Sequence, residues 1–410
     1  MNTQSDATSP GGTKTAVGSF SVTVADTDEE REAIVELARP LFPRTYRASI
    51  RKTDHMLVAW GDGEIIGGLI MKTKETAGNQ IGVISWIFTA RHAREQGVAT
   101  ELLSEGLSYL DEYGCDVAVT DIEGFNSGSA ALFASAGFTR TTSRELARQV
   151  SLRGLLHVWV TLSYQFDFGH FLWAKRLGET SSSEPVESTA SDTAFSTTEQ
   201  SIDSNGITAA VDGQQSLALS WMLNILVIWV AAAAVTAIPT FGLAIPELVA
   251  LAVAGIVLFA LRYLPLWALT RGDPLEWQYR GWFNGIPISI ALGAVLGIFF
   301  PTTGDRYPAS NEWRYAETLQ RIGPAAAISA VFTLWIVVAA GQAPELFPTI
   351  VGASTAGAIQ FVGFSFLVVD LLFVLTPFQC YRGRRIYDWN RPVWILLAGA
   401  TAVVISVTMM

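Results

Sequence analysis

Long apolar runs recur through the second half of this 410-residue chain. From Leu217 onward the runs approach the roughly 18 to 20 residues that a helix needs to cross a bilayer. Because lipid offers no partner to backbone N–H and C=O groups, such runs are confined to helices. We expect an all-α polytopic transmembrane domain over 217–410, with about five or six membrane segments. They are 217–238, 246–269, 283–300, 323–341, 356–376 and 392–409.

The arginines between these segments do not fit six simple crossings. With a cytoplasmic first domain, six crossings would leave the Arg-rich loops at 301–322 and 377–391 outside, against the cytoplasmic excess of basic residues in membrane proteins. A re-entrant segment at 283–300, which contains Pro287 and several glycines, would place both loops inside. We prefer that solution; a crossing by 153–176 is the other.

The N-terminal part of the chain has the pattern of a soluble α/β domain. Two apolar strands within 55–71 are joined by Gly-Asp-Gly, a strong hairpin signal, and further strands are expected at 82–89 and 116–122. Between these two strands, apolar residues at helical spacing over 98–110 indicate a helix with one buried face. We therefore expect a mixed α/β sheet over 18–150.

The flanking segments differ from this domain. Residues 1–17 are polar and Gly/Ser/Thr-rich, as expected of a disordered tail, and 179–216 has almost no large apolar side chains, which predicts a disordered acidic Ser/Thr linker. Residues 151–178 combine many aromatic side chains with charged ones such as Asp167 and Arg176. This favours a segment in the membrane interface, and the last strands of the sheet are the alternative.

Charge and cysteine content narrow the function classes. The net charge is −10 and much of the acidity lies in the linker, so there is no basic face for nucleic acid. The excess of Arg over Lys suggests a salt-loving prokaryote. Cys115 and Cys380 imply no disulfide framework. No basic stretch followed by an apolar run begins the chain, so we expect an integral membrane protein with a cytoplasmic N-terminal domain.

One strand-to-helix turn, at 87–100, has the composition of an anion site. A helix N-terminus presents unpaired N–H groups and a positive dipole end. Gly97 and Ala99 keep side chains away from that end, and Arg94 adds positive charge. Alone, the Arg-x-x-Gly-x-Ala spacing is equally compatible with an ordinary strand-to-helix turn.

This turn, together with the later stretch from Asn126 to Phe138, resembles the acyl-CoA motifs of the GNAT family of N-acetyltransferases. The resemblance covers roughly residues 19–140. It implies acetyl-CoA as cosubstrate, with the backbone of Phe88 and Thr89 pairing with the pantetheine amides. The cofactor-binding residues that it implies are Phe88, Thr89, Arg94, Glu95, Gln96, Gly97, Val98, Ala99, Thr100, Asn126, Ser129 and Phe133.

The catalytic residues are less well defined by the sequence. Phe133 stands where the family often has a Tyr that protonates the leaving thiolate, and phenylalanine cannot donate a proton. Asp121, Glu123 and His92 are the candidate general bases. Each of them could equally be a solvated loop charge.

The helical part resembles the site-2 protease family of intramembrane metallopeptidases. Residues 260–264 stand at its HExxH motif, 276–282 at its β loop, and Gly323-Pro324 at a Gly-Pro pair that opens a helix. Within 377–390, Arg382 replaces that family's aspartate. No histidine follows His170, so we expect no metal site and a pseudoprotease, because catalytic zinc is nearly always held by His.

Two charges within the apolar segments stand out. Arg262 and Asp370 would each be costly in lipid unless paired, so a mutual salt bridge is one hypothesis. The alternative is that Arg262 extends to the membrane surface.

These observations lead to two functional hypotheses. The first is a membrane-anchored N-acetyltransferase acting on an amine of a small molecule, peptide or protein at the cytoplasmic face of a lipid bilayer. The second is a catalytically weak acyl-CoA sensor that regulates the pseudoprotease-like domain and binds a membrane-protein partner.

Overall fold

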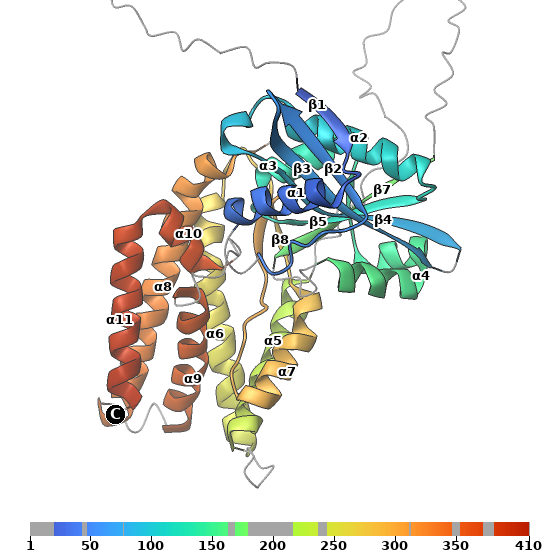
Figure 1. The fold of residues 1–410 in the computed structure, drawn as a ribbon. Coiled ribbons are helices and arrows are strands. Elements are labelled where there is room, and N and C mark those ends of the chain that lie inside the picture. Colours follow the sequence, from blue (N-terminus) through green and yellow to red (C-terminus); the bar gives the residue numbers. More distant parts are fainter. Residues whose placement is uncertain are drawn as a thin grey trace, which may run out of the picture.

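The computed structural model describes residues 20–42, 47–76, 78–162, 169–178, 216–236, 244–310, 313–346, 353–371 and 381–409. The predicted tail at 1–17 and nearly all of the predicted linker at 179–216 lie outside these residues. A sheet domain sits at one end of a set of long helices (Figure 1).

The N-terminal domain is built on one mixed sheet, as the sequence predicts. Only β4 and β5 run parallel; the other neighbours are antiparallel. The spatial order is β1 (Phe20–Val24), β2 (His55–Gly61), β3 (Glu64–Thr76), β4 (Asn79–Thr89), β5 (Val117–Glu123), β7 (His170–Arg176) and β6 (Thr139–Thr141).

Helices cover both faces of this sheet. On β2, Met56 and Val58 face α1 (Asp28–Leu41), whereas Leu57 and Ala59 face the side covered by α2 (Val98–Glu112) and α3 (Ser127–Ser135). This alternation follows from the two-residue period of a strand. Helix α4 (Ser143–Thr161) lies on the α1 side, packed on β4, β5 and β7.

The prediction of an interfacial segment at 151–178 is wrong for residues 170–176. These residues form β7, which is paired with β5 on one side and β6 on the other. Phe171 and Trp173 are buried against the α2 and α3 side, and Ala174 against α4. Phe171 and Trp173 therefore belong to the sheet core, and a membrane crossing by 153–176 is excluded. Residues 163–168 of this segment lie outside the described residues.

The C-terminal part is helical. Four of the described helices are long and apolar enough to cross a membrane, with spans at Leu217–Ala234, Ile245–Thr270, Tyr315–Gln342 and Arg391–Thr408. The helices are α5 (Leu217–Thr236), α6 (Ile245–Thr270), α7 (Ile286–Leu296), α8 (Tyr315–Leu346), α9 (Ala353–Leu371), α10 (Arg382–Trp389) and α11 (Arg391–Met409).

Two features of this region differ from a simple series of crossings. Helix α7 has 11 residues, about 16 Å, so it is too short to cross the roughly 30 Å hydrocarbon layer. Strands β8 (Trp277–Arg280) and β9 (Asp305–Pro308) form a small antiparallel sheet at the polar end of the helices. A re-entrant course for 283–300 remains a prediction.

The expectation that Gly323-Pro324 opens a helix is wrong. Helix α8 begins at Tyr315, so both residues lie inside it. Gly323 is required there by packing, because a Cβ atom at this position would lie 2.4 Å from the Trp389 side chain of α10.

The salt bridge between Arg262 of α6 and Asp370 of α9 is confirmed. Both side chains are buried, at 4% and 10% exposure, and the Arg262 guanidinium also lies 5.2 Å from the centre of the Phe366 ring. The pair joins two helices that are distant in sequence, at a depth where an unpaired charge is expensive.

Reversing one charge of this pair should destabilise the protein strongly, and reversing both should restore it. Arg262→Asp or Asp370→Arg leaves two like charges buried, at a cost of about 3–5 kcal/mol. The measurement is the thermal unfolding midpoint of the purified chain in detergent. The control is reversal of the exposed pair Arg314–Glu317, at 83% and 72% exposure, where about 1 kcal/mol or less is expected. Failure of the double reversal to recover stability would contradict a direct pairing.

Candidate functional site

The parallel strands β4 and β5 part in the middle of the sheet. They pair only at Ile81–Val83 with Val117–Val119, and the described residues form no further pairs between them. The Thr120 hydroxyl donates to the Ile84 carbonyl at 3.0 Å where the strands separate. Beyond that point the β5-facing edge of β4 is open, so an extended ligand can add to it as a strand would.

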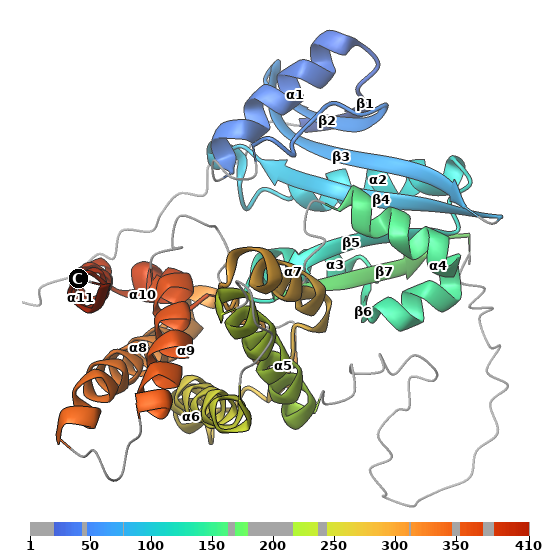
Figure 2. The same cartoon turned by 90° about the horizontal axis from the view of Figure 1, so that it is seen from below.

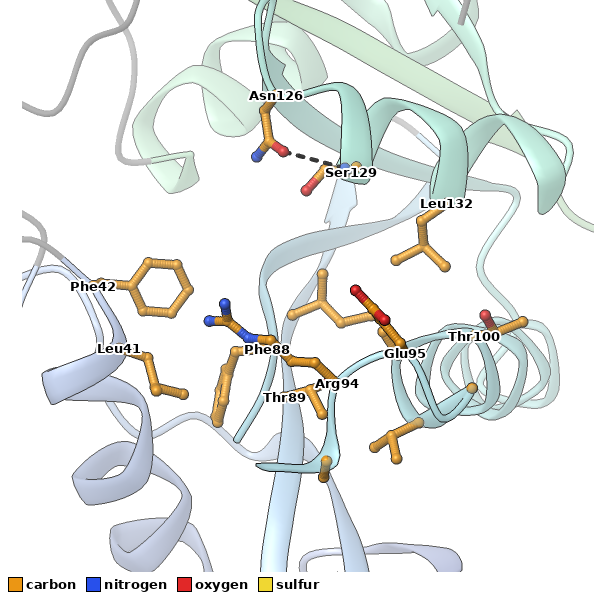
Figure 3. A pocket seen from close by; sticks show the side chains of 16 residues that line it. Leu41, Phe42, Phe88, Thr89, Arg94, Glu95, Thr100, Asn126, Ser129 and Leu132 are labelled. Carbon is orange, nitrogen blue, oxygen red and sulfur yellow. Dashed lines mark hydrogen bonds between the residues drawn. The ribbon is translucent and has the colours of Figure 1, made fainter. Parts of the chain in front are cut away.

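A cavity of about 550 Å³ opens beside the end of β4. It is enclosed by the end of α1, the turn after β4, the start of α2 and the start of α3 (Figure 3). Its lining consists of Leu41, Phe42, Ile87, Phe88, Thr89, Ala93, Arg94, Glu95, Gly97, Val98, Ala99, Thr100, Asn126, Gly128, Ser129 and Leu132.

The structure brings most of the predicted cofactor-binding residues together in this lining. Two of them lie elsewhere. The Gln96 amide donates back to the His92 carbonyl at 2.9 Å. Phe133 is 2% exposed and packs edge-on against Phe138, with ring centres 5.0 Å apart. Phe133 is therefore a core residue and does not line the cavity.

The start of α2 supplies the positive end of the cavity. Its N-cap, Gly97, has φ 84° and no side chain to satisfy the first N–H groups. A Cβ atom at this position would meet nothing within 4 Å, so packing does not require glycine. The left-handed backbone does favour it, because residues with a side chain rarely adopt this conformation. The free N–H groups and the helix dipole attract an anion, and the Arg94 side chain extends across the cavity toward Phe42 (Figure 3).

The start of α3 forms the opposite wall. Asn126 is its N-cap, and the Asn126 side-chain oxygen accepts from the Ser129 N–H at 3.2 Å (Figure 3). This bond fixes the side-chain oxygen, while the amide nitrogen keeps its donors for a ligand.

The structure separates the three candidate bases. Asp121 lies on β5, two residues beyond the last β4–β5 pair, and its carboxylate is 3.1 Å from His170 Nδ1, with both side chains 8% exposed. Glu123 is opposite His170 in the β5–β7 register. His92 is exposed in the 3₁₀ turn η1 (Arg91–Ala93). None of the three candidate bases is part of the cavity lining.

Sequence reasoning missed the Asp121–His170 pair. The two residues meet only because β7 returns beside β5 after α4 has been inserted in the chain. The local sequence around His170 carries no signal for this pairing. A histidine held by a carboxylate is a familiar proton-transfer arrangement.

The loop that carries Asn126 is packed against the helical part of the chain. The Phe125 ring centre lies 4.7 Å from that of Tyr307 in β9, and 4.0 Å from the Arg385 guanidinium of α10. Two residues further on, the Ser127 hydroxyl accepts from the Tyr315 N–H at 3.2 Å. The hydrophobic core of the sheet domain continues into the helical domain through these residues.

A buried charge cluster supports this contact. Asp305 is 2.9 Å from Arg385 and 3.7 Å from Arg382, and all three side chains are at most 2% exposed. Burial by itself would raise the pKa of Asp305, but Arg385, Arg382 and Arg262 outweigh it and hold this pKa below its usual value. Burial lowers the pKa of Arg382 to about 9. Asp305 is thus an ionised partner for both arginines at neutral pH.

The match to known proteins falls on this site. Residues 24–138 match the family model of the acetyltransferase (GNAT) family. The N-terminal domain is a GNAT acetyltransferase domain. A curated relative, N-alpha-acetyltransferase MAK3 of Arabidopsis thaliana, is 26% identical over 106 residues, which are 26% of this chain and 56% of the relative. The chain thus spans little more than half the length of that relative.

Solved structures similar to the GNAT domain include complexes with coenzyme A. The NatC complex bound to Gag peptide and CoA is 17% identical, covering 38% of this chain and 98% of that chain, with a TM-score of 0.29. N-acetylglutamate synthase from Neisseria gonorrhoeae, with coenzyme A and N-acetyl-glutamate, is 18% identical, covering 39% and 35%, with a TM-score of 0.28.

Arg385→Gln should destabilise the chain far more than Arg384→Gln. The substitution removes the nearer of the two arginine partners of the buried Asp305 carboxylate. This should lower the free energy of unfolding by about 3–5 kcal/mol. Arg384 is the matched control, since it pairs with Asp388 at 2.9 Å but is 32% exposed, and about 1 kcal/mol or less is expected. Thermal unfolding of the full chain in detergent measures both. Equal effects would show that the Asp305 cluster does not hold the domains together.

Proposed function

We propose that this protein is a membrane-anchored N-acetyltransferase that transfers an acetyl group from acetyl-CoA to an amine at the cytoplasmic face. One observation carries the proposal: an open β4 edge leads to the uncapped, positive start of α2 within a single cavity. A nucleotide thioester needs both features, a strand edge for its amides and an anion cradle for its pyrophosphate.

Acetyl-CoA would lie along these two features. The pyrophosphate would accept from the N–H groups at the start of α2 and from Arg94. The pantetheine amides would pair with the backbone of Phe88 and Thr89, and the Asn126 amide would donate to the arm from the opposite wall. The thioester would then point toward the place where β4 and β5 part, close to Asp121.

The reaction requires two protons to leave the acceptor nitrogen. An ammonium group must lose the first before its nitrogen attacks the thioester carbonyl. The tetrahedral intermediate then expels the coenzyme A thiolate, and the nitrogen releases its second proton to water as the amide forms. We assign removal of the first proton to Asp121 with His170. The thiolate would take its proton from water, because Phe133 has no proton to give and lies outside the cavity.

The acceptor is an amine whose identity the cavity lining leaves open. The name of the curated relative, N-alpha-acetyltransferase, favours the α-amine of a peptide or protein. Leu41 and Phe42 lie at the edge of the cavity and would favour an apolar neighbour to that amine.

Anchoring rests on the four membrane-length helices. Each remaining apolar segment either crosses the bilayer or turns back within it. This choice decides the side on which the following loop lies. We propose that the Arg-rich loops and the GNAT domain share the cytoplasmic side, in accordance with the bias of basic loops.

Phe133 also supports a second function, an acyl-CoA sensor that binds without turnover and acts on the helical domain. Binding of a ligand at Asn126 would affect the helical bundle through the buried contact between Phe125 and Arg385. We also propose that the bundle is a pseudoprotease, because residues 260–264 and Arg382 replace the ligand-bearing motifs of the family that it resembles. Coenzyme A binding with no thiol release for any tested amine would select this function.

Arg94→Glu should weaken coenzyme A binding at least tenfold, because it replaces a charge-assisted hydrogen bond of about 1.5–3 kcal/mol with repulsion. Isothermal titration calorimetry on the full chain in detergent measures the affinity. Arg91→Glu is the matched control: it makes the same charge change on exposed η1, outside the cavity. Equal affinity of the two variants would remove the proposed pyrophosphate site.

Asp121→Asn should lower kcat by about 10²–10⁴-fold while leaving coenzyme A affinity near that of the parent, because a general base contributes this much to the rate. The assay is thiol release from acetyl-CoA with a peptide amine. Asp116→Asn, an exposed carboxylate at the start of the same strand region, is the control. Activity retained by Asp121→Asn but lost in Glu123→Gln would transfer the role to Glu123.

A further inference from the structure

The second half of α4 is apolar on two opposite faces. Leu155 and Val158 are buried against the sheet. On the other side Leu152, Leu156 and Val160 are 67%, 49% and 71% exposed. A surface helix that packs on a core needs only one apolar face. The outward stripe therefore indicates a second apolar environment.

Exposed basic side chains flank this apolar stripe. Arg153 is exposed next to Leu152 in the second half of α4, and Arg144 and Arg148 are exposed in the first half. Ser151, with φ 68°, bends the helix between the two halves. Basic side chains next to an exposed apolar stripe are typical of helices that lie in the plane of a membrane surface.

The position of α4 points to the same environment. Figure 1 shows α4 on the side of the sheet domain from which the long helices extend, level with the upper part of α5. In Figure 2, seen from below, α4 lies on the near side of β4, β5 and β7. A bilayer crossed by the four long helices would meet this helix first among the elements of the GNAT domain.

We propose that α4 rests in the headgroup region of the bilayer that the long helices cross, with Leu152, Leu156 and Val160 directed toward the acyl chains and Arg148 and Arg153 toward anionic lipid phosphates. This surface goes beyond the proposed enzyme activity and rests only on insertion of the helical domain. A protein partner is disfavoured, because α4 lies on the side from which the long helices extend (Figure 1) and its charges match anionic headgroups.

Spin labels on the full-length chain in nanodiscs test this surface. Cys380 is replaced by serine in every variant; Cys115 is buried, and burial raises its pKa to about 11, so it will not be labelled. A nitroxide is placed by Leu156→Cys on α4, Ser108→Cys on exposed α2 as the aqueous control, and Val403→Cys on α11 as the lipid control. Collision with oxygen and with a water-soluble nickel chelate is measured by electron paramagnetic resonance.

The label at 156 should collide with oxygen severalfold more often, relative to the nickel chelate, than the label at 108. This preference should shrink when Arg148→Glu and Arg153→Glu are combined, and more in nanodiscs with anionic phosphatidylglycerol than in pure phosphatidylcholine. If the labels at 156 and 108 show the same ratio of oxygen to nickel collisions while the label at 403 lies in lipid, the proposal is overturned. Membrane insertion of the helical domain would still hold. Shielding of 156 from both reagents indicates a protein partner and also overturns it. An aqueous label at 403 removes the membrane premise itself, leaving the acyltransferase assays unaffected.

Discussion

The carboxylate of Asp305 is the point on which the arrangement of the two domains depends. It is buried at the polar end of the helices, where two arginines of α10 approach it. A buried carboxylate is stable only when it is fully paired, so Asp305 fixes the position of Arg385. Arg385 in turn lies over the ring of Phe125, in the loop that begins α3. The charge pairing of the helical part thereby supports the loop that carries Asn126, in the wall of the cavity beside β4.

The cavity itself depends on two local constraints. Parting of β4 and β5 after three residue pairs opens a strand edge, and a left-handed glycine before α2 leaves N–H groups without a cap. The first constraint suits an extended chain of amides and the second an anion. Their adjacency, rather than either alone, accounts for the choice of a nucleotide thioester as ligand.

The sequence was informative about the parts of the site that are contiguous in the chain. The turn at 94–100 has the local chemistry of a helix start, but the GNAT resemblance was needed to select it and to point to Asn126. The Asp121–His170 pair could not, because it depends on how β7 pairs after the insertion of α4. The contact between Phe125 and Arg385 joins residues still further apart. The aromatic run at 170–176 was misinterpreted for a different reason: alternating aromatic and charged residues suit both a membrane interface and a strand buried on two faces.

The cluster around Asp305 also bears on the resemblance of the helical domain to site-2 proteases. That resemblance places Arg262 and Arg382 where the family has its metal-binding region. Three arginines and two aspartates share this buried space, and their excess positive charge would repel a divalent cation. The arginines of α10 pair with Asp305, and Arg385 also lies over the ring of Phe125. We therefore interpret this buried charge cluster as a support for the GNAT domain.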